Sequence, residues 1–204
     1  MKLHWSPKSP YVRKVMVVAH ETGLVERLER VRSVAAMLEP NDRLMRDNPL
    51  SKIPTLVLDD GTTLFDSVVI CEYLNDLAGA SLFPEAGAAK WRALRWHAFG
   101  DGLLDALILW RNERDRPDAS RSERLMNAFE RKTIASLHWL DEEAQALQSA
   151  PFGIGHVALG CALGYLDFRF DSLGWRTHAP RLAGWGEAVH ARPSFASTVP
   201  TLAG

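Results

Sequence analysis

Two segments in the first third of the chain hold the side chains best suited to stabilise an anion. Ser9 directly precedes Pro10, and Asp66 and Ser67 directly precede an apolar run. Proline is favoured at the first position of a helix, and Ser and Asp are favoured caps, so both segments predict helix starts. Backbone N–H groups and the helix dipole make a helix start electropositive. A hydroxyl at such a start can donate to an anion, or it can serve only as a cap.

Other reactive side chains form weaker patterns. Cys71 and Cys161 lie far apart in the sequence and form no Cys-x-x-Cys pair, so neither a disulfide framework nor a zinc knuckle is expected. We interpret Cys71 as a small buried residue. His97 and Asp101 are spaced to share one helix face, but two ligands without a third make a poor metal site. We therefore expect a structural role for this pair and no metal.

Composition excludes several function classes. The 204 residues are 47% hydrophobic and 24% charged, with a formal net charge of −1. This balance excludes a generally basic nucleic-acid binder. No apolar run approaches the roughly 20 residues that cross a bilayer, and the N-terminal segment lacks the apolar stretch of a signal peptide. We expect a cytoplasmic protein that binds neither nucleic acid nor membrane.

The elements that must position these groups change in character near residue 80. Short β-rich runs and helical patterns alternate before it, and Asp-Gly at 60–61 joins two of the runs as a hairpin. We expect strands at 2–5, 25–31, 55–58 and 63–65, helices at 11–23 and 68–79, and a loop or short helix over 36–52. The order β-α-β-(loop or helix)-β-β-α is that of a small α/β sheet domain.

Strand patterns disappear after a linker around Pro84 and Gly87. Six of the seven tryptophans lie beyond this linker, which also points to two regions of different kinds. We expect long amphipathic helices over 88–116 and 121–149, a buried glycine-rich helix from 154, and a final helix around 180–191. The second region is therefore predicted to be all-helical.

Four segments resemble those of the glutathione transferase family, and they follow one another along the chain in the same order as in the family. They are Ser9-Pro10-Tyr11-Val12-Arg13, Asn48-Pro49-Leu50-Ser51-Lys52-Ile53-Pro54, Asp66-Ser67, and the glycine-rich helix from Ile154. The resemblance covers nearly the whole chain. It implies a thioredoxin-like domain over 1–80 that binds glutathione, followed by an all-helical domain over 86–204 that supplies the pocket for a hydrophobic electrophile. It also implies a homodimer.

The resemblance assigns Ser9 to catalysis. A free thiol has a pKa of about 8.5, and lowering it by roughly two units requires about 2.7 kcal/mol of stabilisation of the thiolate. A hydroxyl donor at a helix start can supply this. The chain is most similar to the bacterial serine-type branch, because Trp5 and Ser6 stand where tyrosine-type enzymes carry their tyrosine. Ser6 remains the rival hydroxyl, and Arg13 is either an electrostatic aid or a structural charge.

The resemblance also assigns the groups that bind glutathione. Pro54 resembles the family's cis-proline, which exposes the backbone of Ile53 to the cysteinyl unit; from the pattern alone, an ordinary trans proline is the simpler interpretation. Ser67 would bind the γ-glutamyl carboxylate and Asp66 the ammonium group, although both can also be plain caps. Lys52 is either a ligand of the glycyl carboxylate or a solvated lysine.

Three further points remain open. Trp5 and Trp110 are candidates for the electrophile pocket, but the sequence does not identify the electrophile. A glutathione-binding regulatory protein without catalysis and a glutathione-dependent isomerase or lyase are the alternative functions. The family's Ser/Thr-x-x-Asp capping box is replaced by Gly153 and His156. We expect His156 to be a poor substitute for the carboxylate and to lower stability or slow folding.

Overall fold

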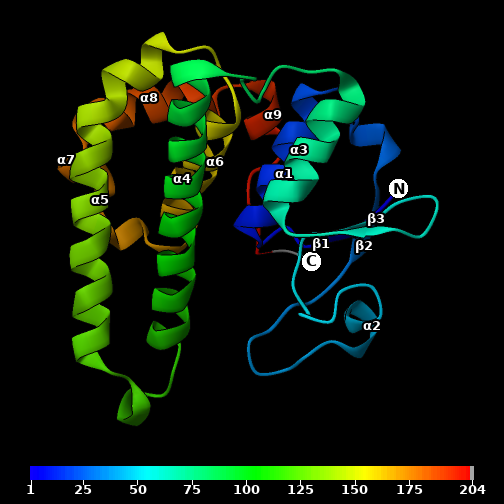
Figure 1. Cartoon of the computed structure of the whole chain (residues 1–204). Helices are drawn as coiled ribbons and strands as arrows, with labels where there is room; N and C mark the ends of the chain where they lie inside the picture. The colour runs from blue at the N-terminus through cyan, green and yellow to red at the C-terminus, as the bar shows by residue number, and fades with distance from the viewer. Residues whose placement is uncertain (203–204) are drawn as a thin grey trace. The chain divides into compact units, whose positions relative to one another are not determined.

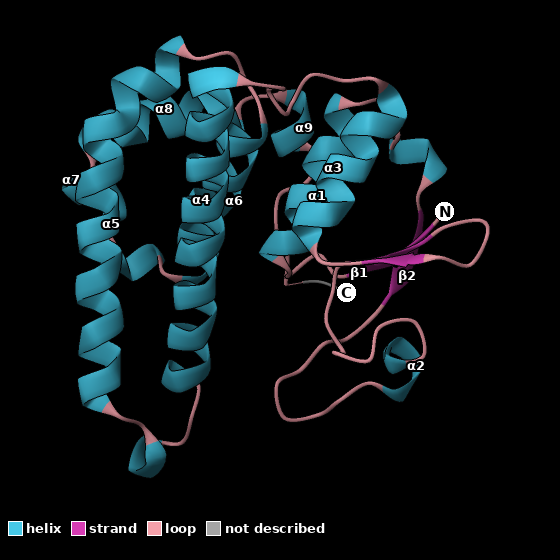
Figure 2. Ribbon diagram, in the orientation of Figure 1, coloured by secondary structure: helices cyan, strands magenta, loops and turns pink. Residues whose placement is uncertain are grey.

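The strands expected near the N-terminus form one four-stranded sheet in the computed structural model, which describes residues 1–202 (Figures 1 and 2). The strands are β1 (Lys2–Trp5), β2 (Glu29–Arg32), β3 (Thr55–Val57) and β4 (Thr63–Leu64), in the spatial order β2-β1-β3-β4. β1 and β2 are parallel, whereas β3 is antiparallel to both β1 and β4. The β-α-β-α-β-β-α order confirms the predicted thioredoxin-like unit.

The helices beside this sheet begin and end where local side chains dictate. They are α1 (Pro10–Glu21), α2 (Asp42–Met45) and α3 (Ser67–Ala78), and α1 packs against α3 (Figure 1). Ser9, Asn41 and Asp66 cap their N-termini. Gly79 ends α3 with a φ of 61°, a left-handed conformation that glycine adopts without steric cost.

One predicted strand is shorter than expected. The alternating pattern over 25–31 predicted a strand throughout, but Val25–Arg27 forms a 3₁₀ turn and β2 begins only at Glu29. The N–H groups of Arg27 and Leu28 donate to the carbonyls of Leu24 and Val25, and these bonds close the turn before β2 begins. Alternation alone therefore misplaced the start of the strand.

The remaining helices confirm the predicted helical region. They are α4 (Gly87–Arg114), α5 (Glu123–Ser149), α6 (Ile154–Arg169), α7 (Trp175–His178) and α8 (Pro180–His190). The buried helix α6 packs closely on α4 because glycines lie at the contact. A Cβ added at Gly100 would lie 2.8 Å from the carbonyl carbon of Ala158, and one added at Gly155 would lie 2.8 Å from Cβ of Trp96. No helix in the described part of the chain is long and apolar enough to span a membrane.

The chain divides into two compact units. Within the described residues, the sheet unit comprises Met1–Ala86 and 193–202, and the helical unit comprises Gly87–Arg192. The C-terminal helix α9 (Pro193–Ala196) belongs to the sheet unit, where it packs on α1. Buried Arg13 donates to the carbonyl oxygen of Phe195 at 3.3 Å and lies over its ring at 5.3 Å. These contacts give Arg13 a structural role.

The start of α6 shows which hydrogen bonds His156 makes. Gly153 has no side chain with which to cap, but its N–H donates to Nδ1 of His156 at 3.2 Å, which is the reciprocal half of a capping box. The other ring nitrogen, Nε2, bonds the carbonyl oxygen of Leu147 at 3.0 Å. The buried imidazole therefore makes the reciprocal bond that the family assigns to a carboxylate. The expected effect of His156 on stability and folding stays a prediction.

Candidate active site

Sheet pairing brings the three predicted site segments to one edge of the sheet. His4 pairs with Thr55, so the C-terminal end of β1 lies beside the N-terminal end of β3. Leu64, the last residue of β4, pairs with Leu56 of β3. The residues that follow β1, precede β3 and follow β4 therefore emerge at the same edge. These segments contain Ser9, Ile53 and Ser67.

Ser9 lies at the start of α1. Its Oγ accepts a hydrogen bond from the N–H of Val12 at 3.3 Å, and Pro10 occupies the first turn. The side chain is half-buried. A hydroxyl has one donor proton as well as acceptor lone pairs, so this cap still has a proton to give. The cap interpretation and the anion-stabilising interpretation are therefore compatible.

Ser6, the rival hydroxyl, lies deeper and belongs to the turn that follows β1. Only 8% of Ser6 is exposed, and its Oγ accepts from the N–H of Lys8 at 3.4 Å. Its carbonyl oxygen accepts from the N–H of Ser9 at 3.3 Å. Ser6 thus shapes the turn that presents Ser9 and is the less accessible of the two hydroxyls.

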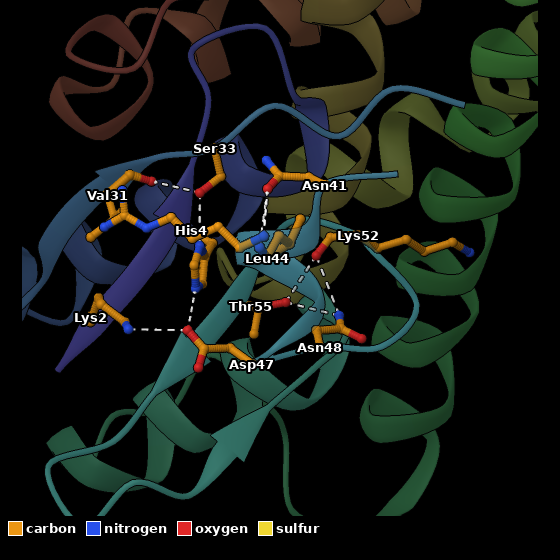
Figure 3. A network of polar contacts seen from close by, with 11 residues as sticks. Lys2, His4, Val31, Ser33, Asn41, Leu44, Asp47, Asn48, Lys52 and Thr55 are labelled. Carbon is orange, nitrogen blue, oxygen red and sulfur yellow. Dashed lines mark hydrogen bonds and ion pairs between the residues drawn. The ribbon is translucent and has the colours of Figure 1, made fainter. Parts of the chain in front are cut away.

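The segment before β3 has the backbone geometry that the resemblance implied. The Ile53–Pro54 peptide is cis, Ile53 is half-buried and Pro54 is buried. Lys52 is exposed, and its side chain extends away from the polar network beneath the loop (Figure 3). This segment can therefore offer the backbone of Ile53 and a solvent-accessible ammonium group.

Asp66 and Ser67 form the start of α3. Asp66 is exposed, and its Oδ1 accepts from the N–H of Val68 at 2.9 Å. One carboxylate oxygen thus caps the helix, while a carboxylate has a second oxygen for another partner. Ser67 is the first residue of the helix and is buried, with 2% exposed. The cap and a ligand-binding role are again compatible.

Sequence reasoning missed a polar network beside this edge. Nε2 of His4 lies 2.7 Å from Oδ2 of Asp47, and Nζ of Lys2 lies 3.0 Å from the same oxygen (Figure 3). The hydrogen bond from His4, assisted by Lys2, holds the pKa of Asp47 below its usual value. Nδ1 of His4 lies 2.7 Å from Oγ of Ser33. The sequence pointed to this network only through His4, a polar residue within the strand expected at 2–5.

The other candidate residues lie partly in the sheet unit and partly in the helical unit. Trp5, at the end of β1, is half-buried, with the guanidinium of Arg30 at 5.7 Å from its ring. Trp110 belongs to the helical unit, where it is buried against the ring of Phe170 at 4.6 Å. Nε2 of His97 lies 3.3 Å from Oδ2 of Asp101. Within residues 1–202, no three His, Cys, Asp or Glu side chains are grouped to hold a metal ion.

Similarity to known proteins extends over the whole chain. Residues 8–77 match the family described as glutathione S-transferase, N-terminal domain. An uncharacterized GST-like protein of Escherichia coli, YibF, is 32% identical, and the match covers 100% of both chains. A glutathione transferase family member from Pseudomonas fluorescens, solved with bound glutathione, is 41% identical with a TM-score of 0.94, covering 98% of this chain and 99% of that one.

A second structure from Pseudomonas fluorescens contains S-(propanoic acid)-glutathione. It is 40% identical to this chain with a TM-score of 0.90, and the match covers 99% of this chain and 100% of that one. The chain belongs to the glutathione transferase family.

Proposed function

We propose that the protein is a glutathione transferase that binds glutathione at the sheet edge and activates its thiol for attack on a hydrophobic electrophile. The observation that carries this proposal is the Ser9 hydroxyl at the start of α1, at the same edge as Ile53 and Ser67. Relatives of 40% and 41% identity hold glutathione or an S-substituted glutathione.

In this proposal the peptide of glutathione is held by its backbone and by its charged ends. The N–H and C=O of Ile53 pair with the cysteinyl unit as an added strand would. Ser67 binds the γ-glutamyl carboxylate at the start of α3, and Asp66 binds the ammonium group. Exposed Lys52 pairs with the glycyl carboxylate. Pro54 fixes the direction of the chain next to Ile53.

Ser9 then stabilises the reacting sulfur. Its O–H donates to the thiolate, while its oxygen accepts from the N–H of Val12 and the dipole of α1 adds positive potential. The sulfur attacks an electrophilic carbon and forms a thioether. The electron pair of the bond that breaks leaves with the displaced group, which is halide for an aryl halide, or in an addition moves to the neighbouring atom, which then takes a proton from water. S-(propanoic acid)-glutathione, held by the relative from Pseudomonas fluorescens, is such a thioether. This ligand supports conjugation as the reaction class.

The proposal includes a homodimer in the cytoplasm, as is typical of the family. The helical unit supplies the apolar surface for the electrophile. Trp110, which lies on α4 in this unit, is a candidate residue for that surface.

The experiment that tests this function separates binding from thiol activation. Calorimetry should show that the wild-type protein binds glutathione, and the ultraviolet absorbance of the thiolate should show a bound thiol with a pKa below that of free glutathione. Turnover of an aryl halide should follow. Absence of glutathione binding would refute the proposal. Binding with an unshifted thiol pKa and no turnover would support the non-catalytic binding protein instead.

A further inference from the structure

The loop between α2 and β3 is held by one buried asparagine. Asn48 is 1% exposed, and it lies at the start of the segment that leads to Ile53 and Pro54. Nδ2 of Asn48 donates to the carbonyl oxygen of Lys52 at 3.3 Å and to Oγ1 of Thr55 at 2.9 Å (Figure 3). The side chain therefore joins the two ends of the loop.

Both polar atoms of the Asn48 amide are used. Its Oδ1 accepts from the N–H of Leu50 at 3.0 Å, while Nδ2 makes the two bonds across the loop. Thr55, which is fully buried, also donates from Oγ1 to the carbonyl oxygen of Lys52 at 2.9 Å. The Lys52 oxygen thus accepts two hydrogen bonds from buried side chains.

These bonds fix the direction of a neighbouring N–H group. The carbonyl of Lys52 and the N–H of Ile53 belong to the same peptide unit, which is planar, so they point in opposite directions. Because Asn48 and Thr55 both donate to the Lys52 oxygen, they restrict rotation of the Lys52–Ile53 peptide plane. The N–H of Ile53 is then directed away from Asn48 and Thr55. This N–H is the group proposed above to bind the cysteinyl unit of glutathione.

A second set of contacts fixes the base of the loop. Asp47, the residue before Asn48, is tied to β1 through His4 and Lys2. β1 in turn pairs with β3, where Thr55 lies opposite His4. Of the two donors to the Lys52 oxygen, Thr55 therefore lies in the sheet, and Asn48 directly follows a residue that is bonded to the sheet.

We propose that Asn48 and Thr55 are positioning residues for glutathione, acting through the Lys52–Ile53 peptide. This inference rests on the proposed function, because it assigns these residues a part in binding the same ligand. Neither side chain touches glutathione in this proposal. Their contribution is to hold the N–H of Ile53 in its binding direction before glutathione arrives, so that binding does not have to order it.

The test compares Asn48→Ala with Asn75→Ala. Asn75 is a buried asparagine of the same unit, 5% exposed, whose Oδ1 accepts from the N–H of Leu82 at 2.9 Å and which lies on α3. Both variants lose buried hydrogen bonds and should lower the melting temperature similarly. Asn48→Ala should raise the Kd of glutathione about tenfold, whereas Asn75→Ala should change it by less than about twofold.

Thr55→Val is the second variant, and it keeps the shape of the side chain while removing Oγ1. It should also weaken glutathione binding, and the double variant Asn48→Ala/Thr55→Val should weaken it by less than the product of the two single effects, since both residues act on one oxygen. This variant tests the proposal if Asn48→Ala does not fold. Lower melting temperatures with an unchanged Kd in both variants would overturn the positioning role.

An NMR measurement on the free protein distinguishes failure of this inference from failure of the proposed function. Asn48→Ala should lower the order parameter of the Ile53 amide, and Asn75→Ala should leave it unchanged. If wild-type protein does not bind glutathione, the proposed function is wrong, and the positioning of glutathione is refuted with it. An order parameter that does not change in Asn48→Ala would refute the positioning of Ile53 even where glutathione binds.

Discussion

The starts of α1 and α6 use the same helix chemistry for different purposes. At α1, the half-buried Ser9 accepts one N–H and keeps a hydroxyl proton to give. At α6, the imidazole of His156 is 4% exposed and both ring nitrogens are bonded, to the N–H of Gly153 and to the oxygen of Leu147. The capping side chain of α6 has all its polar atoms in hydrogen bonds within the protein, so it stabilises the fold. The capping side chain of α1 still has a hydroxyl donor near the surface, so it can bind a ligand.

These hydrogen bonds also determine the charge of the side chain that caps each helix. Nδ1 of His156 accepts from Gly153, so Nε2 carries the proton that is donated to Leu147, and the ring is neutral. Burial lowers the pKa of His156, and the nearby positive charges of Arg192 and Arg92 lower it further. Ser9 has no charge to titrate in this range. We therefore expect substitution of Ser9 to lower mainly activity, and substitution of His156 to lower mainly stability.

The largest expected effect is that of Ser9→Ala on catalysis. Loss of the hydroxyl donor should lower kcat/KM by about 100-fold, as loss of a single donor to a reacting anion does in other enzymes. The pKa of bound glutathione should rise toward its free value. Loss of the cap costs about 1 kcal/mol of folding free energy. Stopped-flow titration of the thiolate and chemical denaturation measure the two effects.

Ser6→Ala is the control for this variant. Ser6 is buried in the preceding turn, so its substitution should leave the thiol pKa nearly unchanged. If Ser6→Ala raised the thiol pKa and Ser9→Ala did not, the catalytic hydroxyl would be Ser6. The comparison between the two helix starts would then fail, because the start of α1 would be only a cap.

The next effect is that of His156→Ala on stability. The substitution leaves the N–H of Gly153 and the oxygen of Leu147 without their partner in a buried site, and it opens a cavity. We expect the free energy of unfolding to fall by about 3 kcal/mol, measured by urea denaturation. The Kd of glutathione should not change where the variant is folded. A large loss of affinity with unchanged stability would show that α6 does not serve the fold alone.

Local signals explain which parts of the fold and site could be predicted. The starts of α1 and α3 depend on Ser9 and Asp66 bonding N–H groups two or three residues away, so the sequence is sufficient. The edge that gathers the site depends on pairing between β1 and β3, and the family pattern supplied that information. A resemblance was therefore needed to bring the segments together.

Contacts distant in sequence explain what could not be predicted. The capping bond of His156 was not predicted because its second bond goes to Leu147, nine residues away, and this bond fixes the tautomer that can accept from Gly153. The pair of His4 and Asp47 spans 43 residues of sequence. Neither histidine lies in a recognisable motif. Each was visible in the sequence only as a polar residue within an apolar segment.

The smallest expected effect is on the pH dependence of stability. Since the folded-state pKa of His156 lies below its unfolded value of 6.5, the unfolded state binds the proton more readily. The contribution of His156 is complete above pH 6.5 and falls as the pH drops from there toward the folded-state pKa. One unit of pKa difference corresponds to about 1.4 kcal/mol. Urea denaturation at a series of pH values measures this loss.

His156→Gln isolates this effect from the other titrating groups. Glutamine can accept from the N–H of Gly153 but does not titrate, so the stability of this variant should fall less than that of the wild type between pH 6.5 and 5. Asp47, whose pKa is lowered, loses its contribution only at lower pH, below its unfolded value of 3.8. If the free energy of unfolding had the same pH dependence in the wild type and in His156→Gln, His156 would not titrate in this range. The N-termini of α1 and α6 would then differ only in how deeply their capping side chains are buried.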